Sequence, residues 1–420
     1  ALSKINKRGA YKCELFGASI TEFAKRLAKD LTMSKKRVLF FTSTRADYGI
    51  LQDLMRQVNE HPSLELQTLV TGAHLSSSHG ASLAEIINDG LPISERVEID
   101  VLSNSGVGTA KSTGLAIIGF ADAITRLSPD VIVLLGDRFE TMAMSQAAMF
   151  LRVPVAHIHG GEVSLGSIDD PIRHSITKMS DLHFVTCRDH RRRVIQLGES
   201  PSRVFDVGSL SVEKIEKQVL FSRDEINRMF DVSPCQQICM VSMHPATASC
   251  ESIIECAKNI IKTLDQHPDF KIFISYSNLE PGGEGLNQIW KDFAHHQKDR
   301  VVLRESFGWK RHLSLMKYAS LMLGNSSSGI IEAASFKLPV VNIGNRQKGR
   351  ICSDNVIHSD ECFEGISAAV KKVLSSNFQQ QISDVVNLYF KPKSSKNIID
   401  QLLLWEPQKE CSFYDLEGNW

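Results

Sequence analysis

The stretch Tyr318–Glu332, with the sequence YASLMLGNSSSGIIE, is the most informative part of this 420-residue chain. The apolar run that ends at Leu323 is typical of a buried strand, and the residues after Gly329 are typical of a helix. A glycine-bounded, serine-rich turn that opens a helix can bind a phosphate, because backbone N–H groups and the helix dipole favour an anion there. Glu332 follows within the first turns, where its carboxylate can accept from both hydroxyls of a ribose. A simple N-capped helix is the alternative interpretation.

Expected strands and helices alternate along the rest of the chain. Alternation of this kind implies parallel sheets that are covered by helices on both faces. Two such series, separated near residues 209–220, predict an α/β protein with two Rossmann-like domains. The expected strands are 37–42, 65–70, 131–135, 153–158, 183–186 and 204–207 in the first series, and 238–243, 271–276, 301–303, 319–323 and 339–343 in the second. The expected helices include 48–59, 109–126, 139–151, 251–266, 309–317 and 329–336.

These patterns divide the chain into four segments. We expect residues 1–32 to be an extension with one amphipathic helix, in which Ser19 and Glu22 match a capping box. The two domains then cover residues 33–210 and 211–390. Residues 391–420 contain a last helix, at about 396–405, which could pack back on the first domain.

Composition excludes several classes of partner. Lysine plus arginine and aspartate plus glutamate both number 48, so neither nucleic acid nor an anionic membrane surface is favoured. The chain has no apolar run of membrane-spanning length and no expected secretory leader. The nine cysteines show no paired zinc-ligand spacing. This pattern is typical of reduced thiols in a cytoplasmic protein, and we expect neither a metal nor disulfides.

Polar side chains follow the carboxyl ends of expected strands in both series. Open parallel sheets bind their ligands beyond these ends, so the side chains should line one cleft. Loops often begin with polar residues, but not with this density of Asp, Glu, His and Arg beside glycines. The residues are Arg45, Asp47, Asp137, Arg138, His157–Glu162, His244, Asn278, Ser326, Ser327 and Arg346.

Each residue type suggests a role in such a cleft. The guanidinium groups of Arg45, Arg138 and Arg346 suit a diphosphate or a planar base edge. Carboxylates at separate strand ends could remove a proton on one face of a sugar and return it on the other. The candidates are Asp137, Glu162, Asp169 and Asp170. The alternative is that Asp137 caps a helix from Phe139 and that Asp169 or Asp170 caps a helix over 172–178.

Histidines are the other candidate proton carriers or phosphate donors. His157 and His159 alternate on one expected strand, so we expect both on the same face. His174 and His244 are further candidates. A metal site is not favoured, since no third ligand follows at suitable spacing.

Six motifs follow one another along the chain. They are RADY (Arg45–Tyr48), GDRFE (Gly136–Glu140), HIHGGE (His157–Glu162), IDDPIRH (Ile168–His174), GNSSSG (Gly324–Gly329) and NIGNRQKGR (Asn342–Arg350). Together they resemble the hydrolysing UDP-N-acetylglucosamine 2-epimerases of sialic acid biosynthesis, over a range from about Lys36 to about His358. The resemblance implies a GT-B-like fold with the active site between the domains. It also implies a homodimer or homotetramer, no metal and no nicotinamide cofactor.

The reaction implied is UDP-N-acetylglucosamine plus water giving N-acetylmannosamine plus UDP. Catalytic carboxylates of the family match Asp137 and Asp169. Some relatives have a catalytic glutamate where this chain has His159, and Glu162 could take over that role. Asp169 and Asp170 could exchange roles, because the preceding loop looks one residue longer than in some relatives. The family's nucleotide contacts match Arg45, Arg138, His244, Asn278, Ser326, Ser327, Glu332 and Arg346.

Four alternatives remain open from the sequence. The same reaction could act on UDP-2,4-diacetamido-2,4,6-trideoxyglucose in legionaminic acid biosynthesis, because the motifs do not fix the sugar. The enzyme could be a non-hydrolysing epimerase, or a glycosyltransferase with a separate acceptor. A non-catalytic UDP-sugar sensor is the fourth alternative, although a sensor has no need for acid/base carboxylates.

Overall fold

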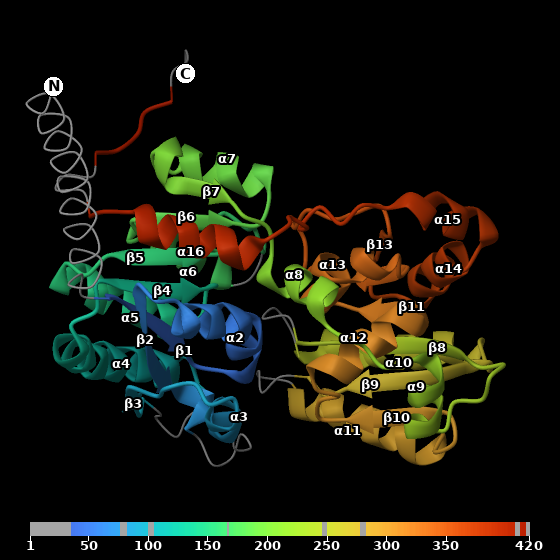
Figure 1. Cartoon of the computed structure of the whole chain (residues 1–420). Helices are drawn as coiled ribbons and strands as arrows, with labels where there is room; N and C mark the ends of the chain where they lie inside the picture. Colours follow the sequence, from blue (N-terminus) through green and yellow to red (C-terminus); the bar gives the residue numbers. More distant parts are fainter. Residues whose placement is uncertain are drawn as a thin grey trace, which may run out of the picture.

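A computed structural model describes residues 35–75, 82–99, 105–165, 168–245, 250–277, 283–407 and 412–416. Within these residues the chain forms two parallel sheets, one of seven and one of six strands (Figure 1). The first has the order β3-β2-β1-β4-β5-β6-β7 and the second the order β10-β9-β8-β11-β12-β13. The predicted helix of residues 1–32 and the candidate Asn278 lie outside the described residues.

The strands of the first sheet are β1 (Lys36–Thr42), β2 (Leu64–Thr71), β3 (Glu95–Val97), β4 (Val131–Leu135), β5 (Val155–Ile158), β6 (Leu182–Val185) and β7 (Val204–Asp206). The strands of the second are β8 (Gln237–Ser242), β9 (Phe270–Ser275), β10 (Val301–Arg304), β11 (Ala319–Gly324), β12 (Val340–Ile343) and β13 (Val356–Ser359). The helices are α2 (Arg45–Glu60), α3 (Ser82–Asn88), α4 (Gly106–Leu127), α5 (Phe139–Leu151), α6 (Asp169–Lys178), α7 (Arg188–Gln196), α8 (Leu210–Lys217), α9 (Arg223–Phe230), α10 (Cys250–Asp265), α11 (Gly283–His296), α12 (Trp309–Tyr318), α13 (Ser327–Ile331), α14 (Phe363–Val373), α15 (Ser376–Gln381) and α16 (Ser394–Leu404).

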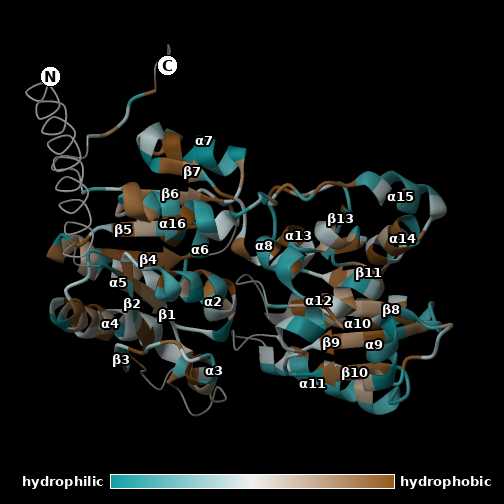
Figure 2. Ribbon diagram, viewed as in Figure 1, coloured by the Kyte–Doolittle hydropathy of each residue, from teal (hydrophilic) through white to brown (hydrophobic). Residues whose placement is uncertain are grey.

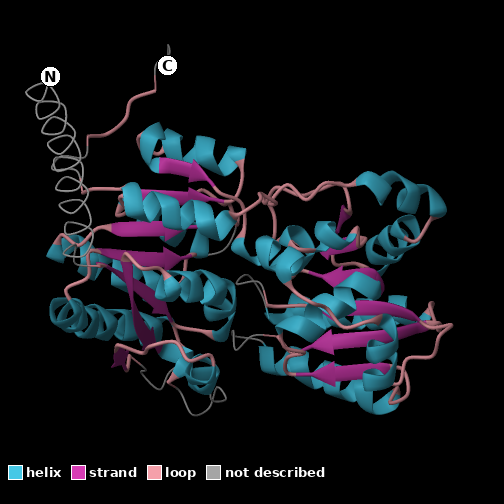
Figure 3. Cartoon of the chain, in the orientation of Figure 1, coloured by secondary structure: helices cyan, strands magenta, loops and turns pink. Residues whose placement is uncertain are grey.

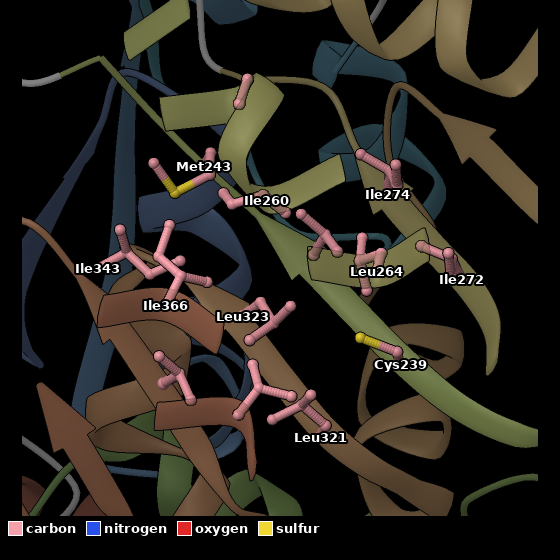
Figure 4. Packing of buried hydrophobic residues seen from close by; sticks show 14 of the residues in the cluster. Cys239, Met243, Ile260, Leu264, Ile272, Ile274, Leu321, Leu323, Ile343 and Ile366 are labelled. Atoms are coloured by element: carbon pink, nitrogen blue, oxygen red, sulfur yellow. The ribbon is translucent and has the colours of Figure 1, made fainter. Parts of the chain in front are cut away.

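Apolar strands buried on both faces build the two cores. All five residues of β4, with the sequence VIVLL, are buried, as a continuous apolar run predicts for a central parallel strand. One cluster packs α2, α8 and α16 on the first sheet, and another packs α4 and α5 on its other face. In the second sheet Cys239, Leu321 and Leu323 pack against Ile260 and Ile366 from the covering helices (Figure 4). Figure 2 shows the same arrangement, with hydrophobic strands between helices of mixed hydropathy.

The last helix returns to the first sheet, beside α2 (Figure 1). Ile398 and Leu402 of α16 are fully buried in the same core as the strands of that sheet. The carboxylate of Glu213 on α8 accepts from the backbone N–H of Ser395 at 3.0 Å. The chain therefore crosses between the two halves of the molecule more than once.

The structure differs from the predicted elements in several places. The edge strands β3 and β13 were not predicted, because each is short and lacks a continuous apolar run. The expected helix over 329–336 is two shorter pieces, α13 and a 3-10 helix over Ala333–Phe336. Helix α6 begins at Asp169, ahead of the expected start at 172.

The carboxyl ends of the strands in both sheets point toward the middle of the molecule (Figure 3). The loops after β1, β4 and β5 therefore face those after β8, β11 and β12. This α/β architecture is GT-B-like. None of the helices in the described ranges is long and apolar enough to cross a membrane.

Candidate active site

Arg173 binds several of the groups in the loops that contain the candidate carboxylates. It lies on α6 with a 1% exposed side chain. Its Nη1 donates to the carbonyl of Glu162 at 3.0 Å and its Nη2 to the hydroxyl of Ser164 at 2.8 Å. The same guanidinium forms ion pairs with Asp137 and, at 3.5 Å, with Asp170. One buried cation thus gathers the loops after β4 and β5. The sequence prediction did not include Arg173, although it lies in the quoted IDDPIRH motif.

The alternative interpretation, in which these carboxylates cap helices, is not what the structure shows. The N-cap of α5 is Arg138 and that of α6 is Ile168, and neither makes a side-chain capping bond. Asp169 and Asp170 lie inside the first turn of α6. Asp170 accepts from the backbone N–H of Ser164 at 2.6 Å and therefore shapes the loop that precedes its own helix. Arg173 thus holds Asp137 and Asp170, and the backbone N–H of Ser164 also binds Asp170. Neither carboxylate caps a helix.

His157 and His159 differ from the prediction that they share one strand face. His157 lies on β5, is fully buried, and its Nε2 is 2.7 Å from the carbonyl oxygen of Gly136. Burial lowers its pKa to about 3, so it is neutral and ties the end of β5 to the turn after β4. His159 lies one residue beyond the strand with φ = +70°, a left-handed conformation that is uncommon for residues other than glycine.

His159 approaches Glu162, which is bound to Arg350 from the second half of the molecule. The Nδ1 atom of His159 is 3.6 Å from Oε1 of Glu162. Nη1 of Arg350, in the loop after β12, donates to Oε2 of Glu162 at 2.6 Å. Burial alone would raise the pKa of Glu162, but the charge of Arg350 acts against it and the pKa is lowered to about 2. Burial lowers the pKa of His159. The pair therefore consists of an anionic carboxylate and a neutral imidazole.

Asn325 organises the turn on the opposite side. Its amide forms two bonds with the backbone of His244, both at 2.8 Å. The backbone carbonyl of Asn325 accepts from the Arg346 side chain at 3.1 Å and from the Gln347 side chain at 2.8 Å. The ends of β8, β11 and β12 are thereby held together. The sequence prediction did not include Asn325, and only its place inside the GNSSSG motif indicated it.

Gly324 and Ser326 shape the turn itself. Gly324 has φ = +133°, and a Cβ there would lie 2.0 Å from the carbonyl oxygen of Ser242, so only glycine fits. Ser326 is the N-cap of α13 and accepts from the N–H of Ser328. Ser327 is the first residue of α13, which has only five residues, so the helix dipole contributes less than a long helix would. Backbone N–H groups and hydroxyls are the main donors that this turn offers.

Glu332 and His244 border the same turn. Glu332 lies directly after α13 and is 7% exposed, and its Oε2 has no hydrogen-bond partner within the described residues. Burial raises its pKa. A buried acceptor of this kind is suited to a hydroxyl donor from a ligand. Burial, with Arg346 nearby, lowers the pKa of His244 to about 3, so its imidazole is neutral.

Arg45 and Arg138 lie at the carboxyl ends of β1 and β4, as predicted from the sequence. Each is already paired, Arg45 with Glu85 at 3.0 Å and Arg138 with Glu140 through two bonds at 3.1 and 3.0 Å. Both side chains are about half exposed, at 59% and 49%. Arg45 is therefore a surface residue at the rim of this edge, and a ligand would have to compete with its carboxylate partner.

The structure thus forms two groups from the predicted residues. Asp137, Glu162 and Asp170 gather on Arg173, and Asp169 begins the same helix. The turn over residues 324–328, which contains Ser326 and Ser327, is called the serine turn. His244, Arg346 and Glu332 surround it. The pair between Glu162 and Arg350 joins the two groups. Within the described ranges, no three His, Cys, Asp or Glu side chains are grouped so that they could hold a metal ion.

Comparisons with known proteins show the family of the chain. The family model described as UDP-N-acetylglucosamine 2-epimerase matches residues 56–403. The chain is 34% identical over 348 residues to the GDP/UDP-N,N'-diacetylbacillosamine 2-epimerase (hydrolyzing) of Campylobacter jejuni, a match that covers 83% of this chain and 90% of that protein. It is 32% identical over 385 residues to the polysialic acid biosynthesis protein P7 of Escherichia coli, covering 91% and 98%.

A solved structure shows the same fold. The UDP-GlcNAc 2-epimerase from Neisseria meningitidis bound to UDP-GlcNAc superposes with a TM-score of 0.75 at 17% identity, over 87% of this chain and 99% of that one. Both the sequence match and the fold extend across the two sheets. The chain therefore belongs to the UDP-N-acetylglucosamine 2-epimerase family.

Proposed function

We propose that this chain is a hydrolysing 2-epimerase that converts a UDP-linked 2-acetamido sugar and water into the free 2-epimeric sugar and UDP. The observation that carries the proposal is the ion pair between Glu162 and Arg350. It brings Glu162, a buried carboxylate of the loop after β5, against the half that contains the serine turn. A substrate with a diphosphate at one end and a sugar at the other suits donors on one side and proton carriers on the other.

The chemistry explains why both sides are needed. The proton on carbon 2 of the sugar is weakly acidic, because no carbonyl is adjacent. When the bond from carbon 1 to the diphosphate oxygen breaks, its electron pair leaves with UDP and carbon 1 gains oxocarbenium character. A base then takes the carbon 2 proton and a double bond forms between carbons 1 and 2. Water adds its hydroxyl to carbon 1. An acid protonates carbon 2 on the face opposite to the one from which the base removed the proton, which gives the epimer.

Residues of the chain can be assigned to these steps as a proposal. The serine turn at Ser326 and Ser327, with Arg346, stabilises the charge that develops on the departing diphosphate. Glu332 accepts from the ribose hydroxyls. The acid/base set consists of Asp137 and Asp169 with one of Glu162 and His159, and Asp170 is the alternative to Asp169. Contact between the two halves would exclude bulk water and align these groups.

Two sugars are candidates for the substrate. UDP-N-acetylglucosamine is the first, since the matching family model is named for it. UDP-N,N'-diacetylbacillosamine is the second, since two relatives at 34% and 33% identity, from Campylobacter jejuni and Legionella pneumophila, are named for hydrolysing epimerisation of that sugar. The two sugars differ at carbons 4 and 6, away from the reacting bond.

Product analysis in heavy water tests the proposal. Each UDP-sugar is incubated with the protein in deuterium oxide, and UDP release and the sugar product are followed by NMR. We expect UDP and a free 2-epimer with deuterium at carbon 2, and oxygen-18 from labelled water at carbon 1. A UDP-linked product would indicate a non-hydrolysing epimerase. Binding without UDP release would indicate a sensor, and either result would contradict the proposal.

A further inference from the structure

We propose that Arg350 is a positioning residue for this reaction: it crosses from the second half of the molecule, fixes the carboxylate of Glu162, and through it holds His159 as the proton-carrying group. This inference rests on the proposed function and deepens it. It assigns different roles to two residues that the sequence left as alternatives, and it adds a residue that the sequence did not select.

The contacts form a short series of groups, of which the central one, Glu162, is buried. Arg350 donates to Oε2 of Glu162 at 2.6 Å, and Oε1 of the same carboxylate lies 3.6 Å from Nδ1 of His159. The side chains of Arg350 and His159 are each 12% exposed, and that of Glu162 is 3% exposed. At 3.6 Å the second contact is too long for a hydrogen bond, but it directs the carboxylate toward Nδ1. A small movement on substrate binding would complete the bond.

Glu162 is poorly suited to act as the base itself. Its ion pair with Arg350 lowers its pKa to about 2, even though burial works in the other direction. A carboxylate with so low a pKa has little affinity for a proton at neutral pH. Its fixed negative charge is instead suited to orient an imidazole, because a carboxylate that faces Nδ1 favours the tautomer with the proton on that nitrogen.

His159 has the properties that this role requires. Its Nε2 is buried and has no hydrogen-bond partner within the described residues, so a lone pair is available there. Its φ of +70° shows that the surrounding loop holds the residue in a conformation that histidine rarely adopts. The charged groups that act on it are Glu162, Arg350, Asp137 and Arg173. Burial is the largest influence and keeps the imidazole neutral, while the two carboxylates raise its pKa and the two guanidinium groups lower it.

Other contacts hold the two loops together without the Arg350 side chain. The backbone N–H of Leu165 donates to the carbonyl of Lys348 at 3.1 Å. A Cβ at Gly349 would lie 2.7 Å from Val163, so the two loops pack closely at that point. Removal of the guanidinium alone should therefore leave the loops in contact. This property separates a positioning role from a purely structural one.

The test uses Arg350→Met, Glu162→Gln and the double variant in the full chain, with UDP release from the preferred UDP-sugar as the assay. We expect each single variant to lower kcat by about 100-fold. The double variant should be no slower than the slower single one, since the residues act through one contact. The Kd for UDP, measured by calorimetry, should change by less than about threefold, which also shows that the variants are folded.

Two further variants complete the design. Arg350→Lys keeps the cation, and because only Nη1 contacts Glu162, it should restore kcat to within about tenfold of the unmodified protein. Lys348→Met removes a cation from an exposed position in the same loop and should leave kcat unchanged. The inference is overturned if Arg350→Met keeps kcat, if the single losses add in the double variant, or if UDP affinity falls as far as kcat. Absence of turnover in the unmodified protein would overturn the proposed function as well.

Discussion

At the scale of single residues, Asp137 is the carboxylate whose replacement tests the proposed chemistry most directly. Asp137→Asn keeps the shape of the side chain and its contact with Arg173, but removes the group that exchanges a proton. We expect kcat to fall by about 100-fold or more while UDP still binds, because Asp137 follows β4 of the first sheet, whereas the serine turn follows β11 of the second. Steady-state kinetics and UDP calorimetry measure the two effects. Asp130, at the other end of β4, pairs with Arg37 on the surface, and Asp130→Asn is the matched control. Normal turnover of Asp137→Asn would disprove its assignment.

Glu332 allows a second prediction at this scale. Its buried Oε2 has no partner within the described residues, so a ligand hydroxyl would gain a charge-assisted bond there. Glu332→Gln should weaken UDP binding by about tenfold, since a bond to a charged group contributes roughly 1.5–3 kcal/mol. The unmodified protein should bind UDP more tightly than 2′-deoxy-UDP, and the variant should lose this preference. Equal loss of affinity for both ligands would show that Glu332 does not contact the ribose.

At the scale of elements, the turn between β11 and α13 depends on one glycine. Gly324→Ala would place a Cβ 2.0 Å from the Ser242 carbonyl oxygen, in a conformation that alanine rarely adopts. We expect the free energy of unfolding to fall by about 1–3 kcal/mol and UDP affinity to fall with it. Urea unfolding and calorimetry give both values. In Gly106→Ala, at the start of α4, the added Cβ meets nothing within 4 Å, so stability and UDP affinity should both be retained. The same result for Gly324→Ala would contradict the assigned role of the turn.

Elements and site residues differ in how well the sequence predicted them. Central strands such as β4 were predicted with their bounds, because burial on both faces requires a continuous apolar run. The edge strands β3 and β13 were not predicted, because one side of each has no neighbouring strand and a short mixed sequence suffices. Asp137, His159 and Glu162 could be selected because they follow strand ends beside glycines. Arg173, Asn325 and Arg350 could not, because their roles come from partners that only the folded chain brings near.

At the scale of the whole molecule, two of the connections between the halves lie far apart in the sequence. The first is the buried contact between Glu162 and Arg350, together with the loops around it. The second is α16, whose apolar face belongs to the core of the first sheet although it follows the second sheet in the chain. The helix keeps the halves connected on one side, while the ion pair connects them beside the carboxylates. The position of one half therefore affects the acid/base groups of the other.

Burial of neutral histidines makes the whole molecule sensitive to acid. Burial lowers the pKa of His157 to about 3 and that of His190 to about 4, from an ordinary value of 6.5. Between pH 6.5 and 4 the unfolded chain therefore binds protons that the folded chain does not, and the free energy of unfolding falls as the pH falls. Each histidine contributes roughly 1.4 kcal/mol per pH unit in this window. Glu162, with its pKa lowered to about 2, adds a further loss only below its ordinary value of 4.5. Urea unfolding at pH 7.5, 6.5 and 5.5 measures this dependence, and His157→Gln should make it shallower. Stability that stays constant or rises between pH 6.5 and 5.5 would show that these histidines can be protonated in the folded protein.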